Sequence, residues 1–120
     1  MLTREVVLLL ELLVGHVVMD FWAQSDALAQ MKNRNRPNTR VPPGQAPQVI
    51  WPYALTAHAM MHGAAVYCVT DSITFGVFET VCHWLIDFGK CENLYGVHFD
   101  QLMHVTCKVA IVIVISLLGG

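Results

Sequence analysis

Five of the six histidines in this chain of 120 residues have a histidine or an aspartate four residues away. Random placement would give a histidine such a neighbour about one time in six. A four-residue spacing puts both side chains on one face of a helix, and metal sites use it when one helix supplies two ligands. The spacing therefore predicts a metal site built on helices. The pairs are His16 with Asp20, His58 with His62, His83 with Asp87, and Asp100 with His104.

Imidazole and carboxylate groups together suit zinc, manganese or iron. We favour zinc, and manganese or iron are the alternatives. The eight candidate ligands exceed what one tetrahedral zinc ion needs. They would serve either two ions, or one ion with the remaining groups orienting its ligands through hydrogen bonds to the imidazole rings.

The composition points to a membrane as the solvent. Hydrophobic residues make up 55% of the chain and charged residues 13%, whereas a soluble domain carries about a quarter charged residues. The net charge of -2 is too small to suggest a nucleic-acid partner. Four apolar stretches, at 7–23, 52–69, 73–88 and 99–118, come close to the length that spans a bilayer.

We therefore predict an all-α fold: a single domain, residues 1–120, forming a four-helix up-down transmembrane bundle in the lipid bilayer. Short connections at 71–72 and 91–96 would make neighbouring helices antiparallel. A soluble four-helix bundle is the alternative, because the first and third stretches are short and interrupted by polar residues.

Residues 31–48 differ from the rest of the chain. They hold the basic residues Lys32, Arg34, Arg36 and Arg40, and the prolines Pro37, Pro42, Pro43 and Pro47. Prolines at this density exclude a continuous helix, so we predict an exposed basic loop at about 31–50. Lys90 falls on the same side of the bundle, and the positive-inside rule places that side in the cytoplasm. Trp22, Trp51 and Trp84 lie toward the same side, as interfacial anchors do.

The paired residues also agree in depth. Counted inward from the basic side, Asp20, Asp87 and Asp100 come first, a histidine follows one turn deeper on each helix, and His62 lies a further turn down. Ionisable groups inside spanning helices are costly, so they usually face the interior and serve function. Two other interpretations stay open: polar bonds between helices, and a pathway for protons or ions.

Glu11, Glu79 and Lys108 lie beyond this histidine layer. A lone lysine in lipid would be costly, so we expect Lys108 to pair with a glutamate. Glu79 precedes His83 by four residues, and reaching the metal is the alternative for it.

Gln24 and Gln101 each border a member of a pair. They would either hydrogen-bond ligands or substrate, or simply add polarity at the interface. Gly63, beside His62, predicts a close contact between helices.

The combined motifs resemble those of the domain-of-unknown-function 3307 family, small membrane proteins of bacteria and their phages. The motifs are His16-x-x-x-Asp20-Phe21-x-x-Gln24, His58-x-x-x-His62-Gly63, His83-x-x-x-Asp87-Phe88-x-Lys90 and Asp100-Gln101-x-x-His104. The resemblance implies a helical protein of the bacterial inner membrane with no established activity. A more distant similarity links the pattern to membrane-bound metal-dependent hydrolases. The long basic, proline-rich loop departs from the family pattern.

The leading functional hypothesis is a metal-dependent hydrolase acting at the cytoplasmic face on a lipid or phosphate-containing substrate. Its metal would activate water and polarise a phosphoryl or acyl oxygen, with Arg34, Arg36 or Lys90 attracting the anion. The alternatives are a small transporter of ions, protons or metal, working as a homo-oligomer, and a non-catalytic membrane adaptor with a structural metal. The sequence contains no nucleophile motif, phosphate loop or cofactor fingerprint that would favour another enzyme class.

Overall fold

Every regular element in the computed structural model is helical across the residues it describes, 2–36, 43–45 and 48–119. The elements are α1 Leu2–Val17, a π-helical turn Val18–Trp22, α2 Asp26–Met31, α3 Trp51–Thr70, α4 Ile73–Cys91 and α5 Val97–Gly119. The predicted all-α fold is confirmed: α3, α4 and α5 cover three of the apolar stretches, while the first stretch, 7–23, is divided between α1 and the π-helical turn. A short helix, α2, is an addition that the apolar pattern does not predict.

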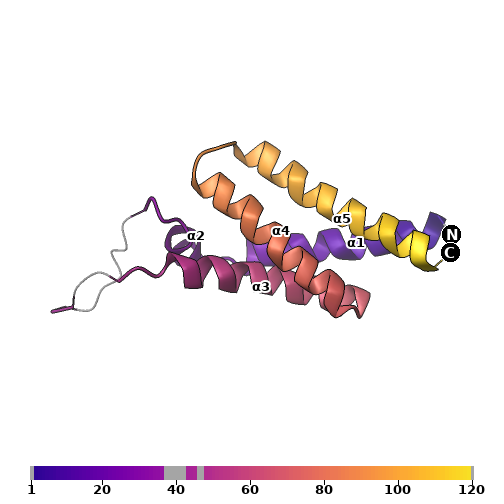
Figure 1. The fold of residues 1–120 in the computed structure, drawn as a ribbon, viewed down its shortest axis with the longest axis horizontal. Coiled ribbons are helices and arrows are strands. Elements are labelled where there is room, and N and C mark those ends of the chain that lie inside the picture. The colour runs from indigo at the N-terminus through magenta and orange to yellow at the C-terminus, as the bar shows by residue number, and fades with distance from the viewer. Residues whose placement is uncertain (1, 37–42, 46–47, 120) are drawn as a thin grey trace.

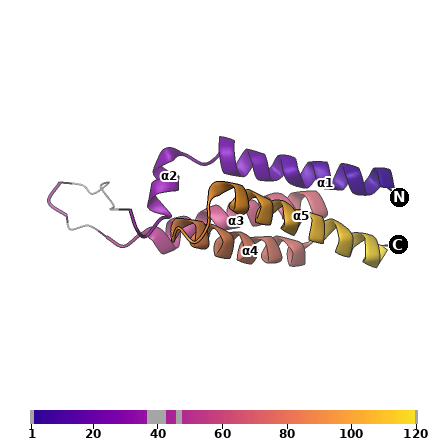
Figure 2. The ribbon, with the colours of Figure 1, turned by 90° about the horizontal axis from the view of Figure 1, so that it is seen from above.

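The four long helices form an up-down bundle in which each helix runs antiparallel to the next (Figures 1 and 2). α1 packs against α3 and α5, and α4 packs against the same two helices. Both ends of the chain lie at one end of the bundle, and α2 lies at the other. We call these the terminal end and the α2 end.

Local sequence signals define the turn between α3 and α4. Asp71 has a positive φ of 53° and ends α3 in the left-handed conformation. The Ser72 hydroxyl then accepts a hydrogen bond from the backbone N–H of Phe75 at 3.4 Å, which caps the first turn of α4. The predicted turn at 71–72 is therefore confirmed.

A glycine pair sets the close approach of α3 and α4. A Cβ atom added to Gly63 would lie 1.9 Å from Thr80 Oγ1 and 2.6 Å from the carbonyl oxygen of Gly76. Only glycine fits at position 63 with the helices at this separation. The helix contact predicted at Gly63 is confirmed.

The interior of the bundle changes character along its length. Toward the terminal end, Leu12, Val66, Ile111 and Val112 form a small apolar core. Toward the α2 end the interior is polar, with buried side chains from every long helix and from Lys32. The buried polar residues are His16, Lys32, His58, His62, Glu79, His83, Asp87, Asp100, His104 and Lys108.

By length and composition, α5 is the one helix in the described part of the chain that could cross a membrane. The finer prediction of four spanning helices stays a prediction.

The predicted exposed loop at 31–50 is partly described. Arg40 and three of the prolines, 37, 42 and 47, lie outside the described residues. Arg34 and Arg36 are exposed, as predicted. Lys32 differs, because it caps the C-terminus of α2 and is only 6% exposed.

Candidate metal centre

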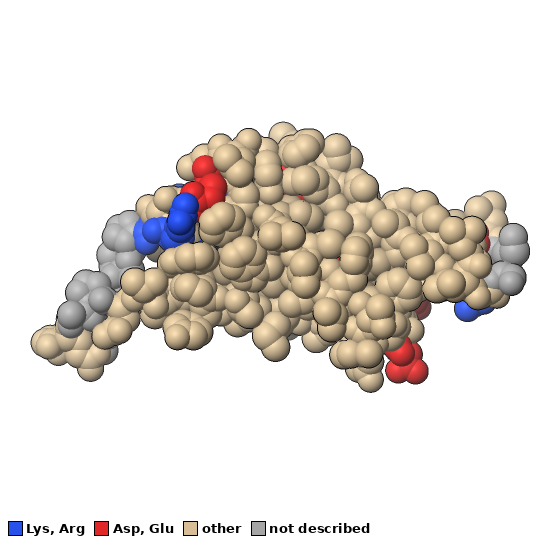
Figure 3. Space-filling model, in the orientation of Figure 1, with Lys and Arg blue, Asp and Glu red and all other residues tan. Residues whose placement is uncertain are grey.

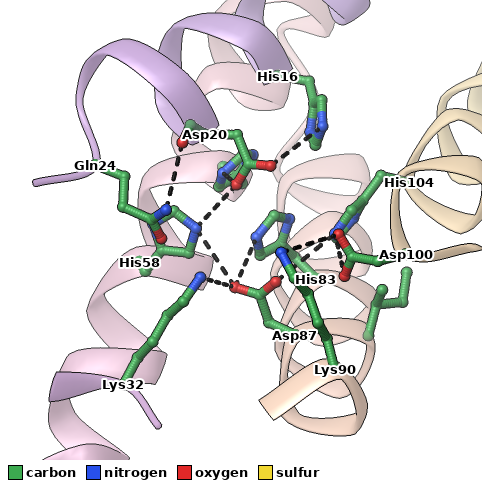
Figure 4. A network of polar contacts seen from close by, with 12 residues as sticks. His16, Asp20, Gln24, Lys32, His58, His83, Asp87, Lys90, Asp100 and His104 are labelled. Atoms are coloured by element: carbon green, nitrogen blue, oxygen red, sulfur yellow. Dashed lines mark hydrogen bonds and ion pairs between the residues drawn. The ribbon is translucent and has the colours of Figure 1, made fainter. Parts of the chain in front are cut away.

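The eight predicted ligands converge in the polar half of the bundle (Figure 4). They form three overlapping groups, and within each group the nitrogen and oxygen donor atoms all lie within 4.8 Å of one another. The first group is Asp20, His58, His62 and His83; the second is His16, His83 and His104; the third is Asp87, Asp100 and His104. The structure therefore brings together every residue that the four-residue spacing singles out.

Helical periodicity explains this convergence. On α5, Asp100, His104 and Lys108 occupy successive turns of one buried face. On α4, Asp87, His83 and Glu79 do the same in the opposite chain direction. Because α4 and α5 are antiparallel, their carboxylates, Asp87 and Asp100, both lie near the α2 end. Their histidines, His83 and His104, lie one turn deeper, as the sequence predicts.

Asp20 reaches the cluster from an irregular segment. It lies in the π-helical turn that follows α1, where the backbone N–H of Ala23 donates to the carbonyl of Val18 at 2.8 Å. Such turns occur frequently at functional sites, because the extra residue changes the direction of the side chains. Asp20 Oδ2 still lies 3.6 Å from His16 Nε2, so the predicted pair is preserved.

The first group surrounds one oxygen of Asp20. Asp20 Oδ1 lies 3.2 Å from His58 Nε2 and 3.4 Å from His62 Nε2. The ring of His62 stacks on that of His83 with centroids 3.6 Å apart. One carboxylate and three imidazoles thus face a common point, a donor set that suits a divalent transition metal.

The third group is richer in carboxylates. His104 Nε2 lies 3.5 Å from Asp100 Oδ1 and 3.8 Å from Asp87 Oδ1. Asp87 and Asp100 are fully buried, with side chains 2% and 1% exposed. Burying two carboxylates in a bundle interior is costly unless cations or hydrogen bonds accompany them.

Several donor atoms of this cluster are buried and make no hydrogen bond to any described residue. They include both ring nitrogens of His83 and of His104, Nε2 of His62 and Oδ1 of Asp100. Most buried polar atoms in proteins are paired, so each exception calls for an explanation. Unpaired imidazole and carboxylate atoms facing one another are what a metal site requires, and the residues present fit a divalent ion.

Two lysines lie beside the carboxylates. Lys32 Nζ is 2.7 Å from Asp87 Oδ2, and Lys90 Nζ is 3.7 Å from Asp100 Oδ2. The contact of Lys32 with Asp87 is not predicted from the sequence, because Lys32 lies in a proline-rich segment that is typical of an exposed loop. The signal that could have revealed it is Ser25, whose hydroxyl accepts from the backbone N–H of Leu28 at 3.1 Å and starts α2. A serine followed by an aspartate is a typical helix start.

Gln101 connects two of the paired carboxylates. Its Nε2 donates to Asp20 Oδ2 at 3.0 Å and to Asp100 Oδ2 at 3.1 Å, while its Oε1 lies 3.1 Å from His16 Nε2. Of the two interpretations of Gln101, hydrogen bonding to the candidate ligands is confirmed. Gln24 donates instead to the backbone carbonyl of Asp20 at 3.4 Å.

An ion pair lies immediately beyond the cluster. Lys108 Nζ donates to Glu79 Oε1, and both side chains are 1% exposed. Glu79 Oε1 also lies 3.6 Å from His83 Nδ1, so the same carboxylate contacts a candidate ligand. The predicted pairing of Lys108 with a glutamate is confirmed for Glu79, whereas Glu11 is exposed.

The family model for proteins of unknown function, DUF3307, matches residues 8–119 of the chain. The chain belongs to the DUF3307 family. No curated protein and no solved structure matches this DUF3307 protein. The more distant similarity to metal-dependent hydrolases therefore stays a prediction.

The polar half of this DUF3307 protein adjoins an open pocket at the α2 end. The pocket has a volume of about 460 Å³, and its lining includes Gln24, Lys32, Arg36, Lys90 and Tyr95. Two of these residues, Lys32 and Lys90, also contact carboxylates of the cluster. Among the described residues, the lining holds three lysine or arginine side chains and one carboxylate, Asp26, so the pocket is basic on balance, and its lysines connect it to the candidate ligands.

A surface ion pair holds the pocket wall in place. Arg34 Nη2 donates to Glu92 Oε2 at 2.8 Å, and Arg34 Nε donates to the other carboxylate oxygen. Asn35 Nδ2 donates to the carbonyl of Cys91 at 2.9 Å. These contacts fix the segment after α2 on the end of α4, and the hydrogen bond from Arg34 holds the pKa of Glu92 below its ordinary value.

Proposed function

We propose that this DUF3307 protein is a multi-pass protein of the bacterial inner membrane that binds divalent metal ions in its bundle. We further propose that it hydrolyses a phosphate-containing, membrane-associated substrate at the cytoplasmic face. The observation that carries the proposal is the buried cluster of histidines and aspartates, in which several ring nitrogens and Asp100 Oδ1 make no hydrogen bond to the described residues, next to a pocket whose lysines contact its carboxylates.

The distribution of side chains supports a membrane location. The polar residues face the bundle interior, while large apolar residues on all four long helices face outward; Leu10, Tyr53, Leu85 and Leu102 are 56–77% exposed. Figure 3 shows charged side chains near the two ends of the molecule and a largely uncharged middle. A soluble protein rarely exposes continuous apolar surface of this kind. Within spanning helices, ionisable residues face the interior, as they do here.

The charges at the α2 end support the orientation. Lys32, Arg34, Arg36 and Lys90 all belong to the segment after α2 or the last turn of α4. Arg4 is the one lysine or arginine of α1 and lies at the terminal end. The positive-inside rule places the α2 end, with its pocket, in the cytoplasm.

The pocket favours an anionic substrate. Its described lining holds three cations, Lys32, Arg36 and Lys90, against the single carboxylate of Asp26, and lysine and arginine are the usual partners of phosphate oxygens. In hydrolysis of a phosphate ester, the oxygen of water bonds to phosphorus, the ester P–O bond breaks, and a proton passes from water to the leaving alcohol. A divalent ion supplies polarisation of the phosphoryl oxygen and a more acidic water.

The interior toward the terminal end argues for hydrolysis over transport. Beyond the histidines lie the Glu79–Lys108 pair and then the apolar core around Leu12 and Ile111. Apolar side chains therefore fill the bundle between the cluster and the terminal end, which argues against a continuous polar pathway through it.

The central test compares two histidine variants purified in detergent. His83→Ala removes a residue common to two of the three donor groups, and we expect it to lose most bound metal together with phosphate release from vesicles containing a phosphate monoester lipid. His98→Ala is the matched control, because His98 is exposed and lies outside the cluster. A His83→Ala protein with the full metal content of the wild type would contradict the metal assignment.

A second arm separates hydrolysis from permeation. Wild-type protein in liposomes loaded with a fluorescent zinc indicator should release phosphate from the lipid while the indicator stays unchanged. Zinc flux without phosphate release would favour a transporter. Full metal binding with neither flux nor phosphate release would favour a structural metal in a membrane adaptor.

A further inference from the structure

The two carboxylate oxygens of Asp87 face different parts of the cluster. Oδ2 lies 3.5 Å from His58 Nε2 and 3.5 Å from His83 Nε2. Oδ1 lies 3.8 Å from His104 Nε2. One side chain therefore presents one oxygen to imidazoles of α3 and α4 and the other to an imidazole of α5 (Figure 4).

Two of the three donor groups, the first and the third, share no residue, while the second group takes His83 from the first and His104 from the third and adds His16. Asp20, His58, His62 and His83 form the first group, and Asp87, Asp100 and His104 form the third. A single ion would use one group and leave the buried donors of the other without a partner, which is costly. Separate groups joined by a carboxylate are the arrangement of a two-metal centre.

We propose that this site holds two divalent metal ions, with Asp87 as the carboxylate that bridges them. The first ion is bound by Asp20, His58, His62 and His83, and the second by Asp100 and His104. This inference rests on the metal site of the proposed function and specifies its stoichiometry and its ligands.

Gln101 supports the division into two ion positions. Its amide nitrogen donates to Oδ2 of Asp20 and to Oδ2 of Asp100, one carboxylate from each group. The other oxygens, both Oδ1, then face His58 and His62 in one group and His104 in the other. Hydrogen bonds of this kind orient ligating carboxylates, so Gln101 would hold the two ligand sets in a fixed relation.

Charge balance connects the two ions to the substrate. The site contains three carboxylates, those of Asp20, Asp87 and Asp100, and two divalent ions would exceed their combined negative charge. The pocket adds further positive charge, because it is lined by Lys32, Arg36 and Lys90 and by one carboxylate, Asp26. A phosphate monoester dianion would offset part of this excess, whereas a neutral ester would offset none of it.

The first experiment titrates wild-type protein in detergent with Mn²⁺ alone and follows it by metal analysis and electron paramagnetic resonance. We expect saturation at two ions per chain and a spin-coupled signal, because a bridging carboxylate couples neighbouring ions. Saturation at one ion, or two ions with uncoupled signals, would overturn the proposal. This measurement uses only the wild-type protein, so its result does not depend on whether a variant folds.

The second experiment assigns the ligand sets. His62 belongs only to the first ligand set and Asp100 only to the second. The variants His62→Ala and Asp100→Ala therefore each remove a ligand from one set. We expect each to retain one ion with an uncoupled signal, while the exposed control His98→Ala retains two. Circular dichroism and gel filtration select variants that keep the helical fold. Loss of both ions from a folded variant would show that the two sets are not separate sites.

The outcomes distinguish this inference from the proposed function. Two coupled ions without phosphate release would uphold the two-metal centre and refute hydrolysis. Phosphate release by a protein that saturates with one ion would do the reverse.

Discussion

Lys32 Nζ lies 2.7 Å from Asp87 Oδ2, in a buried contact between residues 55 positions apart in the chain. The lysine comes from the C-terminal cap of α2 and the aspartate from α4. The same Asp87 oxygen lies 3.5 Å from His58 Nε2 and from His83 Nε2. A cation on a pocket wall therefore shares its carboxylate oxygen with two candidate metal ligands, which couples the pocket to the centre.

Replacing Lys32 with methionine should tighten metal binding. The ammonium group and a divalent ion would compete for Asp87 Oδ2 and repel each other, so removing the charge favours the metal. We expect an affinity gain of roughly tenfold, equivalent to about 1.4 kcal/mol, measured by competition with a zinc chelator. Lys90→Met should have a smaller effect, because Lys90 is 38% exposed and 3.7 Å from its carboxylate. Equal or weaker binding by Lys32→Met would contradict this competition.

The Arg34–Glu92 pair should make the stability of the pocket wall depend on pH. The pKa of Glu92 is lowered in the folded protein, because Arg34 donates hydrogen bonds to its charged form. The contribution is therefore complete above the ordinary glutamate pKa of 4.5 and is lost as the pH falls through the lowered value. Melting temperatures of wild type and Glu92→Gln should differ at neutral pH and converge in acid. A difference that persists unchanged in acid would exclude Glu92 titration as its cause.

The buried Glu79–Lys108 pair should tolerate joint replacement better than the loss of one partner. Either Glu79→Gln or Lys108→Met alone leaves a charge buried in the bundle, and we expect a loss of about 3–5 kcal/mol of stability. The double variant removes both charges and should recover most of that loss. Thermal unfolding in detergent measures the cycle. Additive losses in the double variant would show that the two groups do not stabilise each other.

The sequence predicts which residues form this cluster better than it predicts their surroundings, for a physical reason. His16 with Asp20 and Asp100 with His104 each lie on one helix, where the backbone fixes their relation locally. The antiparallel order then follows from short connections such as Asp71–Ser72. Length, periodicity and turn chemistry were therefore enough to predict which residues meet.

The contacts that the sequence does not reveal depend on longer-range folding. Lys32 belongs to a segment whose composition is typical of an exposed loop. Its side chain is buried because α2, whose C-terminal cap is Lys32, places it against Asp87 of α4. Glu11 shows the converse, because it has the depth of Glu79 along the chain but lies on an exposed face of α1. Depth can be counted from sequence, whereas the rotation of a helix about its axis depends on its neighbours.

The separation of α3 and α4 provides the last prediction, because the cluster depends on it. In Gly63→Ala the new methyl group would meet Thr80 Oγ1 and the Gly76 carbonyl, and the helices must move apart beside His62. We expect a loss of about 1–3 kcal/mol in unfolding free energy, together with weaker binding of metal.

Gly96→Ala is the matched control, because a Cβ there meets nothing within 4 Å. Adding Thr80→Ala should rescue Gly63→Ala only in part, since the Gly76 carbonyl would still lie 2.6 Å from the new Cβ. Full stability in Gly63→Ala alone would show that the two helices do not need this close contact.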